Sequence, residues 1–570
     1  MEEKRICQNK EFSKYCEREF TIVSEDFQFY EKMKVPPPTF CPTCRMIRRF
    51  NFRNEGMLFK RLDDYTREEI FSGYSSHAPI KTYENSYWYS DNWDKLGSGV
   101  DYDFSKPFFE QFQNLLKEAP IPAKSVYNMF NSTYVNEASG CKNVYLSFNA
   151  DYMENSAYLR KMRQVKDSFD SYECEDIELC YECVTVNKSY RTFYSFGCDN
   201  CVDVYFSKNL KGCTNCFGCV NLRNKSYYFF NKPLTKEEYE DKIKQYINGS
   251  YSDLEKTKEE VKKFWELFPN KFYIGNKNTN STGDRLFNTK NVGDSYFVRN
   301  AENVRFCQDV WAKTANCYDY SVWGDGAENI YECMTCGLGI FNLKYCFNCW
   351  ENCYELEYCA YVLNSKNCFG CVGLYKNEYC ILNKQYTKEE YEALLPRIKK
   401  HMVDMPYVDK KGRVYKYGEF FPQETSPTGY NESLANNFFP LTQEETEKNS
   451  YIFNPVIRKD YQITLFNTNI PNNINEVLDT ILKEIIDCKS CRRPYNIISM
   501  ELDFYRKMNL PVPRLCHDCR FLERFTLIKP PIFYKRKCMN QNCNTEFKTN
   551  YSSSDTEIIY CEKCYQQEVI

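Results

Sequence analysis

Cysteine pairs near the C-terminal end of the 570-residue chain have the type and spacing of metal ligands. Each CxxC can place two thiolates on the same side of an ion, so two such pairs suit tetrahedral zinc. Two sets of four follow each other, the second with the spacing CxxxxC and CxxC. They are Cys488, Cys491, Cys516 and Cys519, and then Cys538, Cys543, Cys561 and Cys564. We expect each set to bind one zinc ion.

A third set is predicted at the start of the chain. Residues 16–50 align without a gap with residues 491–525 and share 15 identities in 35 positions, which indicates a duplication. Cys16, Cys41 and Cys44 match three ligands of the C-terminal copy, but Ser13 stands where the first ligand belongs. Cys7 therefore has to reach across a longer loop to complete this site. The prediction is two to three structural Zn²⁺ ions per chain.

A second duplicated segment has lost its cysteines. Residues near 58–90 resemble the last four-cysteine segment and keep Lys60, Arg61, Tyr74, Ser75 and Ser76. Near the ligand positions they carry Asp63, Glu84 and Tyr87 instead. A catalytic ion could not be lost from one copy without losing its chemistry, whereas a structural ion can be replaced by other contacts. The pattern favours structural zinc, a conserved shape and a lost metal.

The totals place the thiols in a reducing compartment. The chain has 32 Cys, and its formal charge of −3 excludes a general polyanion binder. No apolar run approaches the roughly 18 residues that cross a bilayer. We therefore expect a cytoplasmic protein without a membrane partner, in which paired CxxC motifs bind metal more readily than they form disulfides.

The cysteine modules are locally basic. Such residues can grip phosphates or acidic partners, and the alternative is a solvated surface. No recognition helix accompanies the charge, so nucleic acid is one open partner and an unidentified protein another. The basic residues are Arg45, Arg48, Arg49, Arg53, Lys60 and Arg61 in the N-terminal part, and Arg514, Arg520, Arg524, Lys535, Arg536 and Lys537 in the C-terminal part.

The middle of the chain predicts a repeat. Between about 128 and 390 lie the other 20 Cys, within phrases such as "KNVYLSF", "DNCVDVYF" and "ENCYEL" that recur roughly every 9 to 15 residues. Two phrases per turn would make a coil of about 20 to 25 residues. Alternation within the phrases indicates strands, with Asn at the corners. We predict a mainly β fold, a right-handed parallel β-helix whose interior holds the thiols; metal binding by Cys216 and Cys219, or by Cys368 and Cys371, is the alternative.

Helical segments interrupt this pattern. Residues 215–240 and 367–392 match at 16 of 26 positions and end in "TKEEYE", which has the order of a capping box. Residues 252–268 predict another helix, and the amphipathic segment 105–118 predicts one that caps the first open edge of the coil. The expected divisions are 1–57 and 58–127 (metal-binding and metal-free modules), 128–231 and 285–386 (β-helix halves), 232–284 and 387–484 (helical insertion and linker), and 485–529 and 530–570 (zinc modules).

Common catalytic motifs are missing. The chain has three His, and it lacks HExxH, GxSxG, a P-loop lysine motif and a dinucleotide-binding glycine pattern. No catalytic or organic cofactor-binding residue is predicted, and His517 within "CHDC" is interpreted as part of a metal knuckle. A carbohydrate-active lyase or hydrolase is the alternative function, with carboxylates at Asp151, Glu154, Asp167, Asp170, Glu173, Asp309, Asp319 and Asp325.

Three stretches carry a family resemblance: "FYEKMKVPPPTFCPTCRMIRRFNFRNE", "YWYSDNWDKLGSGVDYDFSKPFFEQF" and "FFPQETSPTGYNESLANNFFPLTQEE". Together they resemble an uncharacterised family of cysteine-rich, zinc-ribbon proteins of small-genome uncultivated bacteria. The resemblance extends over nearly the whole chain and implies zinc binding. The sequence departs from that family in lacking the close CxxC at its start. With the features above, it predicts a zinc-binding, non-enzymatic scaffold or interaction protein.

Overall fold

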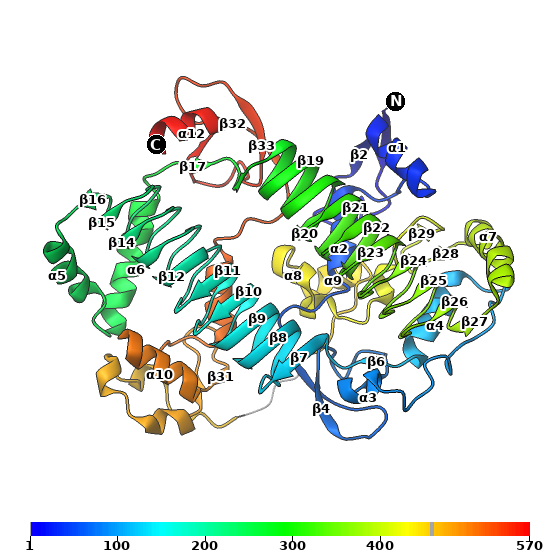
Figure 1. Ribbon diagram of the computed structural model, residues 1–570, viewed down its shortest axis with the longest axis horizontal. Coiled ribbons are helices and arrows are strands. Elements are labelled where there is room, and N and C mark those ends of the chain that lie inside the picture. The colour runs from blue at the N-terminus through cyan, green and yellow to red at the C-terminus, as the bar shows by residue number, and fades with distance from the viewer. Residues whose placement is uncertain (1, 457–460, 570) are drawn as a thin grey trace.

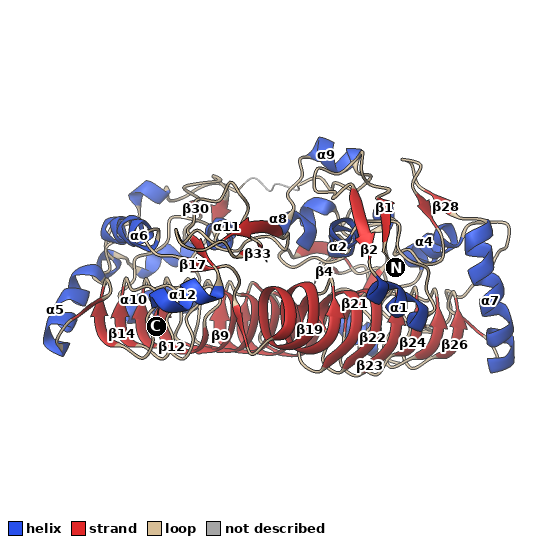
Figure 2. Ribbon diagram, turned by 90° about the horizontal axis from the view of Figure 1, so that it is seen from above, coloured by secondary structure: helices blue, strands red, loops and turns tan. Residues whose placement is uncertain are grey.

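Two ten-stranded sheets dominate the structure, a computed structural model that describes residues 2–456 and 461–569. The fold is mainly β, and the helices and small hairpins gather above the layer that the two sheets form (Figure 1, Figure 2). The first sheet contains β7 (Val126–Phe130), β8 (Val135–Tyr145), β9 (Ser147–Ala157), β10 (Arg160–Lys166), β11 (Tyr172–Glu178), β12 (Asn187–Phe193), β13 (Val202–Tyr205), β14 (Thr214–Phe217), β15 (Ser226–Phe229) and β16 (Lys232–Pro233).

The second sheet follows the same order along the chain. Its last strand, like that of the first sheet, is antiparallel to its neighbour, and all other pairings are parallel. The strands are β18 (Gly275–Asn276), β19 (Thr279–Arg305), β20 (Gln308–Val310), β21 (Thr314–Trp323), β22 (Ala327–Cys336), β23 (Ile340–Lys344), β24 (Tyr354–Glu357), β25 (Lys366–Phe369), β26 (Glu378–Ile381) and β27 (Lys384–Gln385).

The register between neighbouring strands is 12 or 13 residues. Arg160 pairs with Tyr172, 12 positions on, and Cys317 pairs with Ile330, 13 positions on. The expected turn of about 20 to 25 residues was therefore wrong. Each recurring phrase of the sequence corresponds to one full register step, because the chain returns beside itself after one phrase rather than two.

Backbone bends at every third residue explain so short a step. Positive φ angles recur at Asn143, Leu146, Asn149, Tyr152 and Asn155, and this period continues through both sheets. Left-handed backbone is costly for most residues, and Asn tolerates it best. Four bends per step make the step short. The predicted Asn corners are present, but Leu and Tyr occupy others, so side-chain type alone could not reveal the period of three.

The interior thiols are satisfied by the backbone. All 20 mid-chain cysteines are buried, as predicted. The Cys174 thiol donates to the Tyr172 carbonyl (3.3 Å) and accepts from the Val186 N–H (3.3 Å). Ser171 makes the same pair of contacts, to the Phe169 carbonyl (3.0 Å) and from the Cys183 N–H (3.2 Å). Cysteine and serine are thus equivalent on this interior face.

Helices close the far end of each sheet. Both α5 (Lys236–Tyr246) and α7 (Lys388–Asp404) begin with a capping box, as their sequences predict, and α6 (Tyr251–Trp265) is the third expected helix. The expected position of α4 (Phe108–Glu118) was wrong. Its Phe108 ring lies 5.2 Å from the ring of Phe369 in the second sheet, so α4 covers that sheet and not the open edge of the first.

Four small modules lie above the sheets. The first four-cysteine module has β1 (Glu3–Ile6), β2 (Glu19–Ile22), α1 (Ser24–Met33) and α2 (Pro42–Phe50). The cysteine-free module has β3 (Phe59–Leu62), β4 (Glu69–Ser72), β5 (Thr82–Tyr83), α3 (Asn85–Tyr89) and β6 (Ile121–Pro122). The second four-cysteine module has β30 (Ile486–Asp487), β31 (Pro494–Tyr495), α10 (Ser499–Met508) and α11 (His517–Phe525), and the third has β32 (Tyr534–Lys537), β33 (Glu546–Thr549), β34 (Ile559–Tyr560) and α12 (Glu562–Val569).

The remaining elements connect these parts. They are β17 (Asn270–Lys271), β28 (Tyr407–Val408), β29 (Val414–Tyr415), α8 (Leu434–Phe438), α9 (Gln443–Lys448) and five single 3₁₀ turns, Gln423–Thr425, Tyr430–Glu432, Asn467–Asn469, Ile474–Glu476 and Asp479–Lys483. The β17 strand pairs with β34 and joins the third four-cysteine module to the entry of the second sheet. Within the described residues no helix has the length and apolar character needed to span a membrane.

Candidate metal centres

Three groups of four cysteines could each hold a metal ion. In each group the four sulfur atoms lie within 4.8 Å of one another. Among the described residues, no other group of three or more Cys, His, Asp or Glu side chains was found in such an arrangement. The groups are Cys7, Cys16, Cys41 and Cys44; Cys488, Cys491, Cys516 and Cys519; and Cys538, Cys543, Cys561 and Cys564.

The sulfur separations match a tetrahedral site. The Cys16 and Cys41 Sγ atoms lie 3.9 Å apart, and the Cys491–Cys516 and Cys543–Cys561 separations are both 3.7 Å. Four sulfurs at about 2.3 Å from a central zinc would lie about 3.8 Å from one another. With four thiols each, the clusters leave no open position for a water molecule or a substrate.

The same local structure positions the ligands in the modules. The first ligand follows a strand, and its Sγ accepts the backbone N–H of the third ligand, at 3.2 Å from Cys41 to Cys7 and at 3.3 Å from Cys516 to Cys488. Cys41 and Cys516 are also the N-caps of α2 and α11. The positive end of a helix and donated N–H groups both favour thiolate.

Cys7 replaces the ligand that Ser13 does not provide. Its N–H donates to the Arg18 carbonyl (2.8 Å), as the Cys488 N–H donates to the Arg493 carbonyl (2.9 Å). The longer loop therefore changes the connection between the first two ligands and leaves the start of the site in place. Ser13 lies outside the group, where its hydroxyl accepts the Tyr15 N–H (3.3 Å).

Two ligands have pKa values near neutrality. Burial raises the pKa of Cys488, but N–H groups of Cys516, Cys491 and Ser490 outweigh it and lower that pKa to about 7. Hydrogen bonding to Thr545 lowers the pKa of Cys543 to about 6. Metal binding requires thiolate, so both shifts favour it at neutral pH.

The cysteine-free module replaces the first metal ligand by a carboxylate. Asp63, fully buried, accepts N–H groups from Tyr65 (2.7 Å), Thr66 (2.6 Å) and Glu84 (2.5 Å). The bond from Glu84 corresponds to the one that the Cys561 N–H donates to Cys538 Sγ in the third four-cysteine module. Tyr65 stacks on Tyr87 with ring centroids 4.0 Å apart. Hydrogen bonds and aromatic packing thus stand where the ligands would be.

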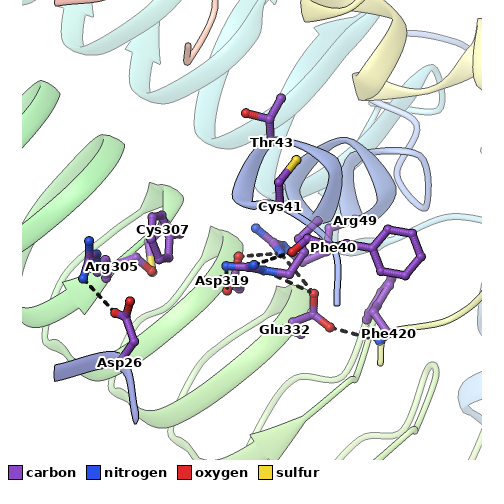
Figure 3. Close-up of polar contacts among 12 residues, drawn as sticks. Asp26, Phe40, Cys41, Thr43, Arg49, Arg305, Cys307, Asp319, Glu332 and Phe420 are labelled. Carbon is purple, nitrogen blue, oxygen red and sulfur yellow. Dashed lines mark hydrogen bonds and ion pairs between the residues drawn. The ribbon is translucent and has the colours of Figure 1, made fainter. Parts of the chain in front are cut away.

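Buried ion pairs fasten the first four-cysteine module to the second sheet. From α2, Arg45 and Arg49 reach the two carboxylate oxygens of Asp319, at 2.8 and 3.1 Å (Figure 3). Arg48 contacts Glu332 at 3.1 Å and Glu419 at 3.2 Å. No sequence signal points to either glutamate, because the three partners lie on segments far apart in the chain.

The second four-cysteine module makes equivalent contacts with the first sheet. Arg520 and Arg524 of α11 contact the two oxygens of Asp170, at 3.3 and 3.1 Å, and Arg520 also contacts Glu501 at 2.8 Å. All four of the aspartate-binding arginines are at most 5% exposed. As positions for nucleic-acid contact these arginines were wrongly assigned, and Arg48 and Arg53 are buried as well, because their charge is neutralised inside the protein.

The candidate catalytic acids are engaged in the same kind of contact. Asp170 and Asp319 hold the modules, and Glu173 contacts Arg285 at 2.6 Å, which joins the two sheets. Asp309 pairs with Lys161 at 3.3 Å. The four acids therefore do not form an open catalytic cluster.

The mid-chain CxxC-like pairs do not form metal sites in this structure. Cys216 and Cys219 donate to the carbonyls of Thr214 and Phe217, and Cys368 and Cys371 donate to those of Lys366 and Phe369. All four side chains are fully buried. The metal alternative for these pairs is therefore not supported, since successive thiols line the interior rather than converge on one point.

Comparisons with known proteins add little. No protein-family model matches the chain, and no curated protein matches it. Among solved structures, one match is a "putative acetyltransferase" from Desulfovibrio desulfuricans G20, at 10% identity and a TM-score of 0.11, covering 50% of this chain and 85% of that one. A TM-score this low supports no conclusion about fold or function.

Proposed function

We propose that this protein is a zinc-binding, non-enzymatic scaffold or interaction protein, built on two right-handed parallel β-helices and located in a reducing cytoplasm. Zinc is the ion that best suits four thiolates in a closed tetrahedral group. The parallel register of 12 or 13 residues, without a helix between successive strands, supports the β-helix. Such a frame offers extended faces to a protein partner.

One observation carries the proposal: each four-cysteine group is complete in itself, and the best-matched modules are fixed to the sheets by buried arginines. Catalytic zinc sites keep one position open for water or substrate, whereas structural sites are closed by four protein ligands. The ions would then hold each small module in the shape that presents its arginines. The ion pairs made by Asp170, Glu173 and Asp319 favour this function over a carbohydrate-active enzyme.

Elemental analysis of the full chain, purified without added metal, tests the proposal. We expect about three zinc ions per chain, in keeping with the three groups. Chelation should expose trypsin sites in the modules before it affects the two large sheets, because the sheets have their own buried cores. Iron with visible absorbance, or a zinc-free protein of unchanged protease resistance, would contradict it.

A further inference from the structure

A polar cavity lies between α6, the first sheet and the second four-cysteine module. Its volume is about 240 Å³, and its lining includes Glu182, Lys258, Lys489, Arg514 and Glu523. Glu182 is paired with Lys258 at 3.2 Å. The cavity is separate from the three metal groups and plays no part in the function proposed above.

The corresponding place at the first four-cysteine module is filled by the chain itself. The Gln8 side chain exchanges two hydrogen bonds with the backbone of Val414, at 2.8 and 3.2 Å. Thr39 donates its N–H (2.8 Å) and its hydroxyl (2.6 Å) to the Glu419 carboxylate. Arg48 donates to the other oxygen of Glu419 at 3.2 Å. An extended segment, residues 414–421, is therefore held mainly through one carboxylate.

The duplication places the cavity residues at these same positions. Arg514 aligns with Thr39 and Glu523 with Arg48. Lys489 corresponds to Gln8, because the Lys489 N–H donates to the Arg514 carbonyl (2.9 Å) as the Gln8 N–H donates to the Thr39 carbonyl (3.2 Å). Glu182 and Glu332 are likewise equivalent, since they follow the paired tyrosines Tyr181 and Tyr331 at matching positions of the two sheets. The second module has the cavity where the first has a bound segment.

The cavity also contains an unsatisfied donor. Arg514 is 7% exposed, and its Nη2 donates to the carbonyls of Ile470 (2.8 Å) and Pro471 (2.9 Å). Its Nη1 is buried and has no hydrogen-bond partner among the described residues. A buried charged donor without an acceptor is costly, and a carboxylate is its natural partner. Lys489, half of it exposed, adds a second positive charge at the rim.

We propose that this cavity binds a carboxylate on an extended peptide segment of a partner protein, in the manner in which the first module binds Glu419. The replacement of Gln8 and Thr39 by Lys489 and Arg514 makes the second position more basic. An acidic peptide that approaches between α6 and the module would supply the acceptor that Arg514 lacks. The neighbouring Glu182 and Glu255 face Lys258 and Lys489, which balance their charges.

Fluorescence anisotropy on the full, zinc-loaded protein tests this site. The probe is a fluorescein-labelled peptide VYKYGEFF, the sequence of residues 414–421, and the comparison peptide carries Gln in place of Glu. We expect saturable binding of the first peptide at low salt and at least tenfold weaker binding of the second. Arg514→Gln should weaken binding about tenfold and Lys489→Gln severalfold, because charge-assisted bonds are lost.

Controls separate this site from the metal groups. Lys507→Gln, an exposed change on α10, should leave peptide binding unchanged. Zinc content and the unfolding midpoint should be those of the parent protein in Lys489→Gln, so that variant still decides the matter if Arg514→Gln does not fold. Equal binding of both peptides, insensitivity to Lys489→Gln, or no binding at all would overturn the proposal. Binding of free succinate but of neither peptide would also overturn it, since the occupant would then be a small carboxylate.

Discussion

Asp170 and Asp319 occupy the same position in the two large sheets. Asp170 follows Phe169, which is five parallel pairings from Phe229 on the last parallel strand; Asp319 follows Tyr318, which is five pairings from Ile381. Each aspartate receives two arginines one helical turn apart. The duplication therefore includes the sheets, and each of these two modules docks on the sheet that is farther from it in the sequence.

Aromatic contacts repeat the same relationship. Phe29 of the first module stacks on Tyr318 at 3.9 Å, and its counterpart Phe504 lies 4.6 Å from Phe169. Tyr30–Tyr331 and Tyr505–Tyr181 are both 5.5 Å apart. Two different sheets thus preserve one docking site, which indicates that docking matters as much as metal binding.

Loss of one docking aspartate should destabilise the protein strongly. Asp319→Asn leaves Arg45 and Arg49 buried beside a neutral group, and breaking a buried ion pair on one side costs about 3 to 5 kcal/mol. Chemical denaturation followed by fluorescence measures the change, and proteolysis locates it. Asp241→Asn, at an exposed pair on α5, is the control and should change the free energy of unfolding by less than about 0.5 kcal/mol. A result for Asp319→Asn close to that of the control would contradict the docking role.

Removal of one metal ligand should remove one ion. Cys516→Ser should lower the zinc content by one per chain and open the second four-cysteine module locally, because a small module without its ion has little core of its own. Cys353→Ser, inside the second sheet, is the matched control and should retain all the zinc. Equal zinc loss in both variants would mean that the mid-chain thiols also hold metal. Elemental analysis and hydrogen exchange provide the two measurements.

The ligand sets could be predicted from the sequence because CxxC spacing is local. The mainly β character and the capped helices α5, α6 and α7 were equally local, since caps and alternation depend on neighbouring residues. The register step could not be predicted, because the bends fall on Leu146 and Tyr152 as well as on Asn. The docking pairs were missed for another reason: Arg45 and Asp319 look like separate surface charges until the fold brings them together.

Asp63 should stabilise the cysteine-free module. In Asp63→Ala three backbone N–H groups lose their acceptor, which should cost about 2 kcal/mol locally. Hydrogen exchange at residues 58–90 should rise, while zinc content stays constant. Glu68→Ala, an exposed change in the same turn, should have no measurable effect. If Asp63→Ala behaved like Glu68→Ala, the carboxylate would not be the replacement for a metal ligand.

The interior thiols should be silent to thiol reagents until the protein unfolds. Burial raises the pKa of Cys307 and of Cys353 to about 12, against about 8.5 for a free thiol. Labelling of the folded protein should therefore stay slow from pH 7 to pH 9, while that of the unfolded chain accelerates. A folded pKa above the unfolded one stabilises the protein below the unfolded pKa, so the free energy of unfolding should fall as the pH rises from about 8 toward about 12. Immediate labelling of the folded protein would contradict the buried arrangement.

Substitution of one interior thiol distinguishes packing from metal binding. Cys174→Ala should cost on the order of 1 kcal/mol, below the usual range for Leu→Ala because a thiol is smaller. From the sequence, serine is expected to cost more, since a buried hydroxyl could lack a partner. The structure reverses that order: Ser171 already donates to a carbonyl and accepts an N–H in the pattern of Cys174, so Cys174→Ser should cost no more than Cys174→Ala. Thermal unfolding of the two variants measures the difference, and zinc content should be unchanged in both. A large loss of stability in both, accompanied by loss of zinc, would show that Cys174 is a ligand.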